Sequence, residues 1–179
     1  MTPTIRTRSG ISFNLIDPDP ALINILDIAH ALAHICRFTG HTHTFYSVAE
    51  HSVRASLLPC VPPEHALEVL LHDAAEAYIG DVSSPLKAQL REYQIIEFRI
   101  EQAIRKRFGL PPKKAACVKQ ADLIMLATEK RDLMFAHDEE WDVLQGIATL
   151  DKPITVCYAP HQAEVYFLDR YAQLSGATL

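Results

Sequence analysis

Helical periodicity constrains this chain more than any other feature of its sequence. From about residue 25 onward, apolar residues recur at intervals of three and four, which places them on one face of an α-helix. Prolines interrupt the pattern between successive segments, where a helix has to end. The pattern predicts helices over about 25–37, 46–58, 64–79, 89–108, 112–137 and 161–174.

The N-terminal residues 4–16 follow a different pattern, because β-branched residues flank the pair Ser9 and Gly10. This pattern predicts a short β-hairpin, and the sequence DPDP then stops any regular element. We therefore expect an all-α fold with a small N-terminal β-hairpin. A chain of 179 residues is long enough for one hydrophobic core and too short for two. We expect a single domain over 1–179, with 1–20 as an N-terminal extension.

Charge and cysteine content narrow the functional classes. A net charge of -5 argues against binding to extended nucleic acid, because phosphate backbones require clustered lysine and arginine. The four cysteines include no CxxC pair, which indicates reduced thiols. No apolar run is long enough to cross a bilayer, and the N-terminus lacks the apolar segment of a secretion signal. We therefore expect a cytoplasmic protein with no membrane partner.

The densest group of ionisable residues lies in LLHDAAEAYIGDVSSPLK, residues 70–87. On the helix predicted here, an apolar stripe faces the core and consists of Leu67, Leu70, Leu71, Ala74 and Tyr78. His72, Asp73 and Glu76 fall on a separate face, where spacings of three and four let their side chains converge. Glu68 falls on a third side, which we expect to be solvated. The separate polar face indicates the wall of a site.

Two further polar residues lie on apolar stripes of other predicted helices. Asp122 shares a stripe with Met125, and His51 lies between Val48 and Ala55. Burying an unpaired carboxylate is costly, so Asp122 must be paired or bound to a metal. Imidazole nitrogen and carboxylate oxygen together suit Mn, Fe, Co, Ni or Zn. The sequence thus predicts a metal centre with ligands from three helices: His51, His72, Asp73 and Asp122.

The order of these residues and their flanking segments resembles the HD-domain metal-dependent phosphohydrolases. The segments that carry the resemblance are RF at 37–38, SVAEHS at 47–52, HDAAEAYIGDVSSPLK at 72–87 and KQADLI at 119–124. More narrowly, the chain is similar to the branch that holds bacterial deoxyribonucleoside 5′-monophosphatases and small phage dATP triphosphohydrolases. The match spans about residues 25–137.

The resemblance implies a role for each matching residue. The four predicted ligands would hold one divalent ion, which can be Co, Mn, Zn, Mg, Ni or Fe. Glu76 and Asp81 match the catalytic acids that position or deprotonate water and assist the leaving oxygen. Arg37 and Lys87 would neutralise phosphate oxygens of the substrate. Phe38, where relatives often carry tryptophan, would pack on the sugar or base.

The function that the resemblance implies is hydrolysis of phosphate ester bonds in small (deoxy)nucleotides. Release of phosphate from a monophosphate and release of triphosphate from a triphosphate both stay open. The alternative is an inactive, metal-stabilised module for nucleotide binding or scaffolding, although intact Glu76 and Asp81 argue against it. A di-iron oxygenase on the same fold would need more ligands than we can place.

A second histidine pair occurs at His30 and His34, with the spacing of a helical zinc pair. No acidic residue lies between them and the sequence indicates no third ligand. We therefore favour a packing or hydrogen-bonding role for this pair.

The predicted helix over 89–108 carries more apolar residues than one buried face requires, namely Ile95, Ile96, Phe98 and Ile100. From this excess, and because relatives in the branch commonly associate, we expect a homo-oligomer.

Overall fold

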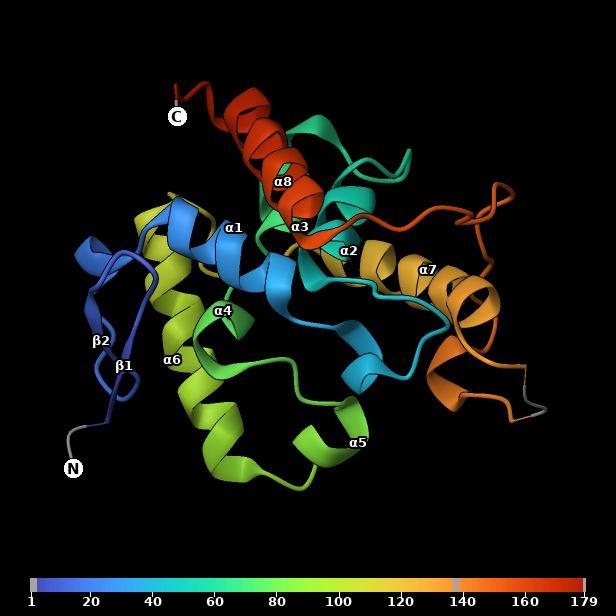
Figure 1. Cartoon of the computed structure of the whole chain (residues 1–179), viewed down its shortest axis with the longest axis horizontal. Coiled ribbons are helices and arrows are strands. Elements are labelled where there is room, and N and C mark those ends of the chain that lie inside the picture. The colour runs from blue at the N-terminus through green and yellow to red at the C-terminus, as the bar shows by residue number, and fades with distance from the viewer. Residues whose placement is uncertain (1–2, 137–138, 179) are drawn as a thin grey trace.

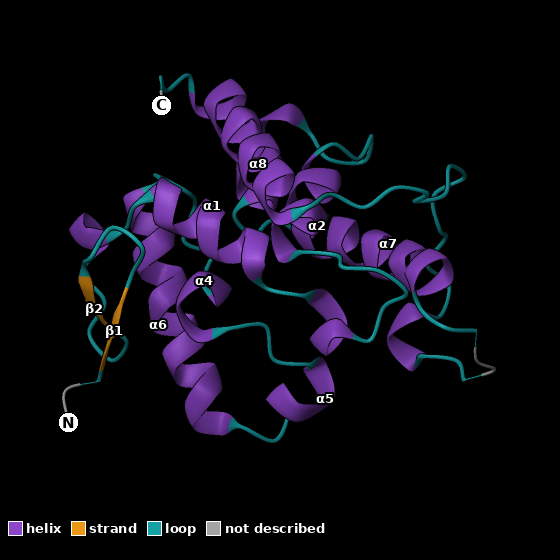
Figure 2. Ribbon diagram, viewed as in Figure 1, coloured by secondary structure: helices purple, strands orange, loops and turns teal. Residues whose placement is uncertain are grey.

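Helices account for most of the chain, as its periodicity predicts (Figure 2). The computed structural model describes residues 3–136 and 139–178. The α-helices in these ranges are α1 (Ile25–His34), α2 (Val48–Ser56), α3 (Ala66–Leu70), α4 (Glu76–Ile79), α5 (Ser84–Lys87), α6 (Arg91–Arg107), α7 (Ala116–Leu133) and α8 (Pro160–Ser175). Short 3-10 helices cover Pro20–Leu22, Arg37–Gly40, Pro63–His65 and Asp142–Leu144. The fold is thus all-α apart from the N-terminal strands.

The predicted β-hairpin is confirmed. Strand β1 (Thr4–Arg6) pairs antiparallel with strand β2 (Ser12–Asn14). Phe13 of β2 is fully buried and stacks on the ring of Tyr78 in α4, with 4.1 Å between the ring centroids. This contact docks the hairpin on the helical core, beside α6 in Figure 1.

Helix α2 lies at the centre of the fold, and α1, α3, α7 and α8 pack against it (Figure 1). Ser47 caps its N-terminus, because the hydroxyl accepts a hydrogen bond from the backbone N–H of Glu50. All its residues except Arg54 are buried. A polar residue on α2 therefore needs a partner inside the protein.

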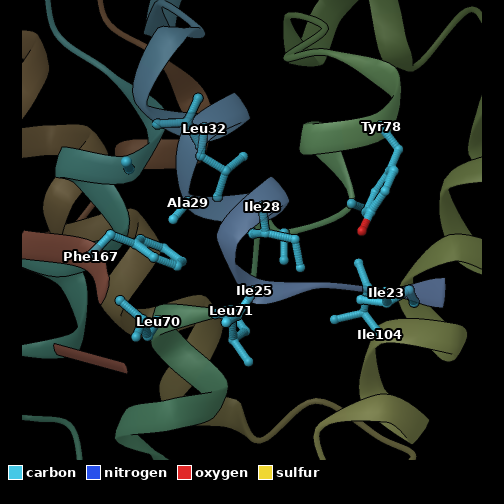
Figure 3. Close-up of a cluster of buried hydrophobic side chains, with 14 of the residues drawn as sticks. Ile23, Ile25, Ile28, Ala29, Leu32, Leu70, Leu71, Tyr78, Ile104 and Phe167 are labelled. Carbon is cyan, nitrogen blue, oxygen red and sulfur yellow. The ribbon is translucent and has the colours of Figure 1, made fainter. Parts of the chain in front are cut away.

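The larger of two apolar clusters joins helices from both ends of the chain (Figure 3). Its buried members include Ile25, Ile28, Leu32, Leu70, Tyr78, Ile104 and Phe167. Because these side chains come from α1, α3, α4, α6 and α8, their burial brings distant segments together and holds the intervening turns in place.

The helix predicted over 64–79 is interrupted, which corrects the sequence interpretation. α3 ends at Leu70, residues 71–75 form turns, and α4 begins at Glu76. His72 and Asp73 therefore lie in the turns between two short helices. Gly80 has a φ of 79° and ends α4, a conformation that glycine adopts without steric cost.

Glu68 is also placed differently from the prediction, because it is 2% exposed rather than solvated. It accepts hydrogen bonds from Arg105 Nη2 at 2.7 Å and from the backbone N–H of Ala115 at 3.1 Å. A buried carboxylate requires such partners. The ion pair joins α3 to α6, and the hydrogen bond from Ala115 joins α3 to the segment before α7.

The remaining predicted helices are confirmed in position, with shifted ends. α1 ends at His34 instead of residue 37, and α7 covers Ala116–Leu133, whereas the prediction ran over 112–137, whose last residue lies outside the described ranges. Across the described ranges, no helix combines the length and apolar character that crossing a membrane requires.

Candidate metal centre

Three segments bring the predicted ligands together. His51 comes from α2 and is fully buried, His72 comes from the turn before α4, and Asp122 comes from α7. The Nε2 atoms of the two histidines lie 3.3 Å apart, and Asp122 Oδ1 lies 3.6 Å from that of His51 and 4.0 Å from that of His72. The ligand atoms of all three lie within 4.8 Å of one another, so this group can hold a metal ion.

Asp73, the fourth predicted ligand, lies against both histidines. Its Oδ2 atom is 3.1 Å from His72 Nε2 and 3.7 Å from His51 Nε2. The same oxygen accepts a hydrogen bond from Arg37 Nη1 at 3.4 Å. All four predicted ligands therefore converge on one place, although they come from three parts of the sequence.

The other nitrogen of each ring decides whether a cation fits. His72 Nδ1 lies 2.7 Å from the carbonyl oxygen of Val69, and His51 Nδ1 lies 2.6 Å from Glu129 Oε1. Both oxygens accept, so each Nδ1 carries the hydrogen and donates it. In neutral rings the two Nε2 lone pairs then face each other and the carboxylates, an arrangement that repels unless positive charge lies between them. The residues therefore fit a divalent cation.

The pKa values of these groups show the same preference for positive charge. Burial by itself would lower the pKa of His72, but Asp73 and Asp122 outweigh burial and raise it above its ordinary value. Burial would raise the pKa of Asp73 and of Asp122, but the histidines His72 and His51 lower both. The histidines and the carboxylates thus stabilise each other's charged forms.

Glu129 on α7 contacts the ring nitrogen of His51 that does not face the other candidate ligands. This residue was not identified from the sequence. It is fully buried and accepts hydrogen bonds from His51 Nδ1, from the Tyr46 hydroxyl at 2.8 Å and from Arg37 Nε at 3.1 Å. Burial would raise its pKa, but Arg37 and His51 outweigh burial and lower it to about 2. Glu129 follows Asp122 by seven residues, two helical turns, and this spacing is the signal that would have placed both on one face.

Arg37 reaches the centre from the 3-10 segment Arg37–Gly40 that follows α1. Its backbone N–H donates to the carbonyl oxygen of Tyr46 at 2.9 Å. Phe38 and Thr39 adopt left-handed φ angles of 53° and 54°, which cost of order 1–3 kcal/mol each outside glycine. The Arg37 guanidinium lies 5.4 Å from the Phe38 ring centroid. Their predicted contacts with a nucleotide stay predictions.

Two predicted catalytic acids adjoin the centre. Glu76 is 5% exposed, and its Oε2 atom is buried with no hydrogen-bond partner among the described residues. Burial raises the pKa of Glu76 well above its ordinary value, and Asp73 and Asp81 raise it further. Burial also raises the pKa of Asp81 against the opposing effect of Arg37. A carboxyl group whose pKa is raised by burial and by neighbouring carboxylates suits general acid–base chemistry.

A cavity of about 170 Å³ opens beside Glu76, His72 and Asp73, with room for several water molecules. Lys87 and Lys114 line it; the first donates to Glu97 Oε1 at 2.6 Å and the second pairs with a carboxylate of α6 at 3.3 Å. Lys87 matches a predicted site residue. Lys114 was missed because it lies outside every motif in the sequence.

The fold and site define a class: a helical protein whose core holds a histidine–aspartate centre able to bind a metal ion. No protein-family model matches the chain. It is 46% identical over 173 residues to the uncharacterized protein YfdR of Escherichia coli (strain K12), covering 96% of this chain and 95% of that protein. It is 37% identical over 154 residues to the uncharacterized protein RCAP_rcc00048 of Rhodobacter capsulatus, covering 79% of this chain and 78% of that protein. The chain belongs to the family of these proteins.

Proposed function

We propose that the chain is a metal-dependent phosphohydrolase of the HD-domain type, which cleaves a phosphate ester bond of a (deoxy)nucleotide. The observation that carries the proposal is the pair of facing Nε2 atoms of His51 and His72, with Asp122 beside them and the unpartnered carboxyl oxygen of Glu76 in the same region. The motif segments at 47–52 and 72–87 support it.

The metal would be held by His51, His72, Asp73 and Asp122. When bound, a divalent ion supplies Lewis acidity, polarising a phosphoryl oxygen and lowering the pKa of a water molecule. Glu129 holds the imidazole of His51 with Nε2 free of hydrogen, because it accepts the Nδ1 hydrogen. The carbonyl oxygen of Val69 does the same for His72.

The two acids would carry out the proton transfers. One carboxylate takes a proton from the water whose oxygen forms the new bond to phosphorus. One carboxylic acid gives a proton to the ester oxygen as its bond to phosphorus breaks. The charge of Asp81 raises the pKa of Glu76, so the two acids can differ in protonation, as the two tasks require. Lys87 and Lys114 offer positive charge to the phosphate oxygens in the adjoining cavity.

A panel of nucleoside and deoxynucleoside mono-, di- and triphosphates tests the proposal, with Mn²⁺, Co²⁺, Mg²⁺ or Zn²⁺ supplied in turn. Chromatography of the products distinguishes a monophosphatase, which releases phosphate, from a triphosphohydrolase, which releases triphosphate. If no nucleotide is cleaved by protein that has bound metal, the proposal is wrong. Tight nucleotide binding in that case would favour the inactive binding module.

The variant Glu76→Gln tests the assigned acid. We expect turnover to fall by about 100-fold to 10,000-fold, because the amide cannot exchange a proton, while the bound metal stays unchanged. The matched control is Glu64→Gln, since Glu64 is an exposed glutamate of the neighbouring segment. Full turnover in Glu76→Gln would contradict the assignment, and so would a loss of metal that accounts for the lost turnover.

A further inference from the structure

A second cluster of metal-ligating side chains lies between α1 and α8. His30 and His34 lie one turn apart on α1, with 4.3 Å between their ring centroids. Glu164 of α8 faces them, and its Oε2 atom is 3.0 Å from His30 Nδ1. One ligand atom from each of the three residues lies within 4.8 Å of the other two. The third ligand that the local sequence does not indicate thus comes from a residue 134 positions away.

We propose that His30, His34 and Glu164 form a second site for a divalent ion of the zinc class, which joins α1 to α8. This proposal does not rest on the proposed function, because the central site uses none of the three residues. Two imidazole nitrogens and one carboxylate oxygen suit zinc, nickel or copper far better than magnesium or calcium.

His34 keeps one ring nitrogen available, and an ion would replace the hydrogen bond between His30 Nδ1 and Glu164 Oε2 with a bond to each atom. His34 Nδ1 lies 2.7 Å from the carbonyl oxygen of His30 and must donate to it, so His34 Nε2 carries a lone pair. The two carboxylate oxygens of Glu164 have different partners. Oε1 accepts a hydrogen bond from Arg8 Nη1 at 2.9 Å, while Oε2 faces His30. A partner outside the metal shell that holds one carboxylate oxygen also orients the other. The two oxygens of Asp122 in the central site also have different partners, because Oδ2 accepts a hydrogen bond from Lys119 at 3.0 Å.

Access and space favour binding of an ion from solution. His34 is exposed, and the side chain of His30 is 34% exposed. A cavity of about 120 Å³ reaches His30 from the side of the β-hairpin and is also lined by Arg6 and Arg8. Three protein ligands would leave at least one coordination position for water or a small anion.

The ion would strengthen a contact that already organises the fold. α1 and α8 pack side by side, although 125 residues, 35–159, separate the end of α1 from the start of α8. The structure gives this contact the apolar residues Leu32 and Phe167 on its buried side. The proposed site lies on its outer side, where His34 is exposed. An ion there closes a long loop, which restricts the unfolded chain.

Zinc itself is the probe, added to metal-free protein that carries no polyhistidine tag. After equilibrium dialysis, elemental analysis should find two zinc ions per chain in the wild type. We expect one in His34→Ala, one in Asp122→Ala, and none in the double variant. His161→Ala is the matched control, because it removes an exposed histidine of α8 three residues before Glu164 and should keep both ions.

Glu164→Gln is the second variant, which keeps the size of the side chain and removes its charge. It should also hold one ion, and zinc should raise the unfolding temperature of the wild type more than that of either His34→Ala or Glu164→Gln. Equal zinc content in the wild type and His34→Ala would overturn the proposal. Two retained ions in Glu164→Gln would overturn it too, because the ion would then lie elsewhere.

Discussion

The ability of the candidate centre to hold a metal ion depends on which nitrogen of His51 and of His72 carries hydrogen. Glu129 accepts the Nδ1 hydrogen of His51, and the backbone oxygen of Val69 accepts that of His72. Both Nε2 atoms are thereby left as ligands. Tyr46 and Arg37 also donate hydrogen bonds to Glu129. A fully buried carboxylate with three donors is a rigid support, because any rotation would leave one of them unpaired.

The variant Glu129→Gln should weaken metal binding by about 10-fold to 100-fold, because His51 loses its charged partner and with it the bias toward the required tautomer. Competition with a chromophoric chelator measures the dissociation constant. Tyr46→Phe is the matched comparison, since it removes one donor to Glu129 and keeps the carboxylate. We expect a smaller loss in Tyr46→Phe, and a metal affinity in Glu129→Gln equal to that of the wild type would show that the support is dispensable.

At the scale of elements, the ion pair between α3 and α6 holds α3 beside the segment that precedes α7. Arg105 of α6 donates to Glu68, to the carbonyl oxygen of Lys113 at 3.0 Å and to that of Pro111. These bonds hold the segment that precedes α7, from which Lys114 reaches the cavity. A single arginine thus links the short helix before His72 to one wall of the cavity.

Replacement of Arg105 by methionine should lower the free energy of unfolding by about 3–5 kcal/mol, because Glu68 would stay buried without a cation. Urea unfolding monitored by circular dichroism measures the change. The double variant Glu68→Leu, Arg105→Met should recover part of the loss, since neither charge is then unpaired. A double variant less stable than Arg105→Met would show that the remaining bonds of Glu68, not the ion pair, dominate.

At the scale of the whole molecule, the central site joins α2, the turn before α4, and α7. An ion bound there stabilises the folded state alone, because the unfolded chain does not hold these ligands together. An ion bound there would therefore join segments that are 71 positions apart, as counted from His51 to Asp122.

Removal of the metal should lower stability in a way that depends on metal concentration. At a free concentration of 100 times the dissociation constant, one bound ion contributes about 2.7 kcal/mol to the free energy of unfolding. The measurement uses His34→Ala, so that the proposed outer site does not contribute. Chelator-treated and Mn²⁺-saturated samples are compared by urea unfolding. In the double variant His34→Ala, Asp122→Ala, metal should not change the free energy of unfolding. The same gain in that double variant would show that the ion binds elsewhere.

Self-association stays a prediction at this scale. In α6, Ile100 is buried as one face requires, whereas Phe98 is 61% exposed and Ile95 is 45% exposed. Part of the apolar excess noted in the sequence therefore lies on the surface of the chain.

Much of the fold follows from local patterns. The hairpin, the positions of the long helices and the inward direction of His51 and Asp122 could be predicted, because periodicity records which side of each element is apolar. The break between α3 and α4 could not. Residues 71–75 keep the helical spacing of apolar residues while forming turns, and periodicity does not distinguish a helix from successive turns.

The sequence by itself determined the types of candidate ligand and the inward faces on which His51 and Asp122 lie, because burial penalises a polar group that has no partner. Only the tertiary structure decided which partners meet. Glu164 reaches His30, Arg105 reaches Glu68 and Lys114 reaches the cavity because separate helices pack together, and such distances are set by the packing of apolar faces from distant segments. No local spacing in the sequence records them.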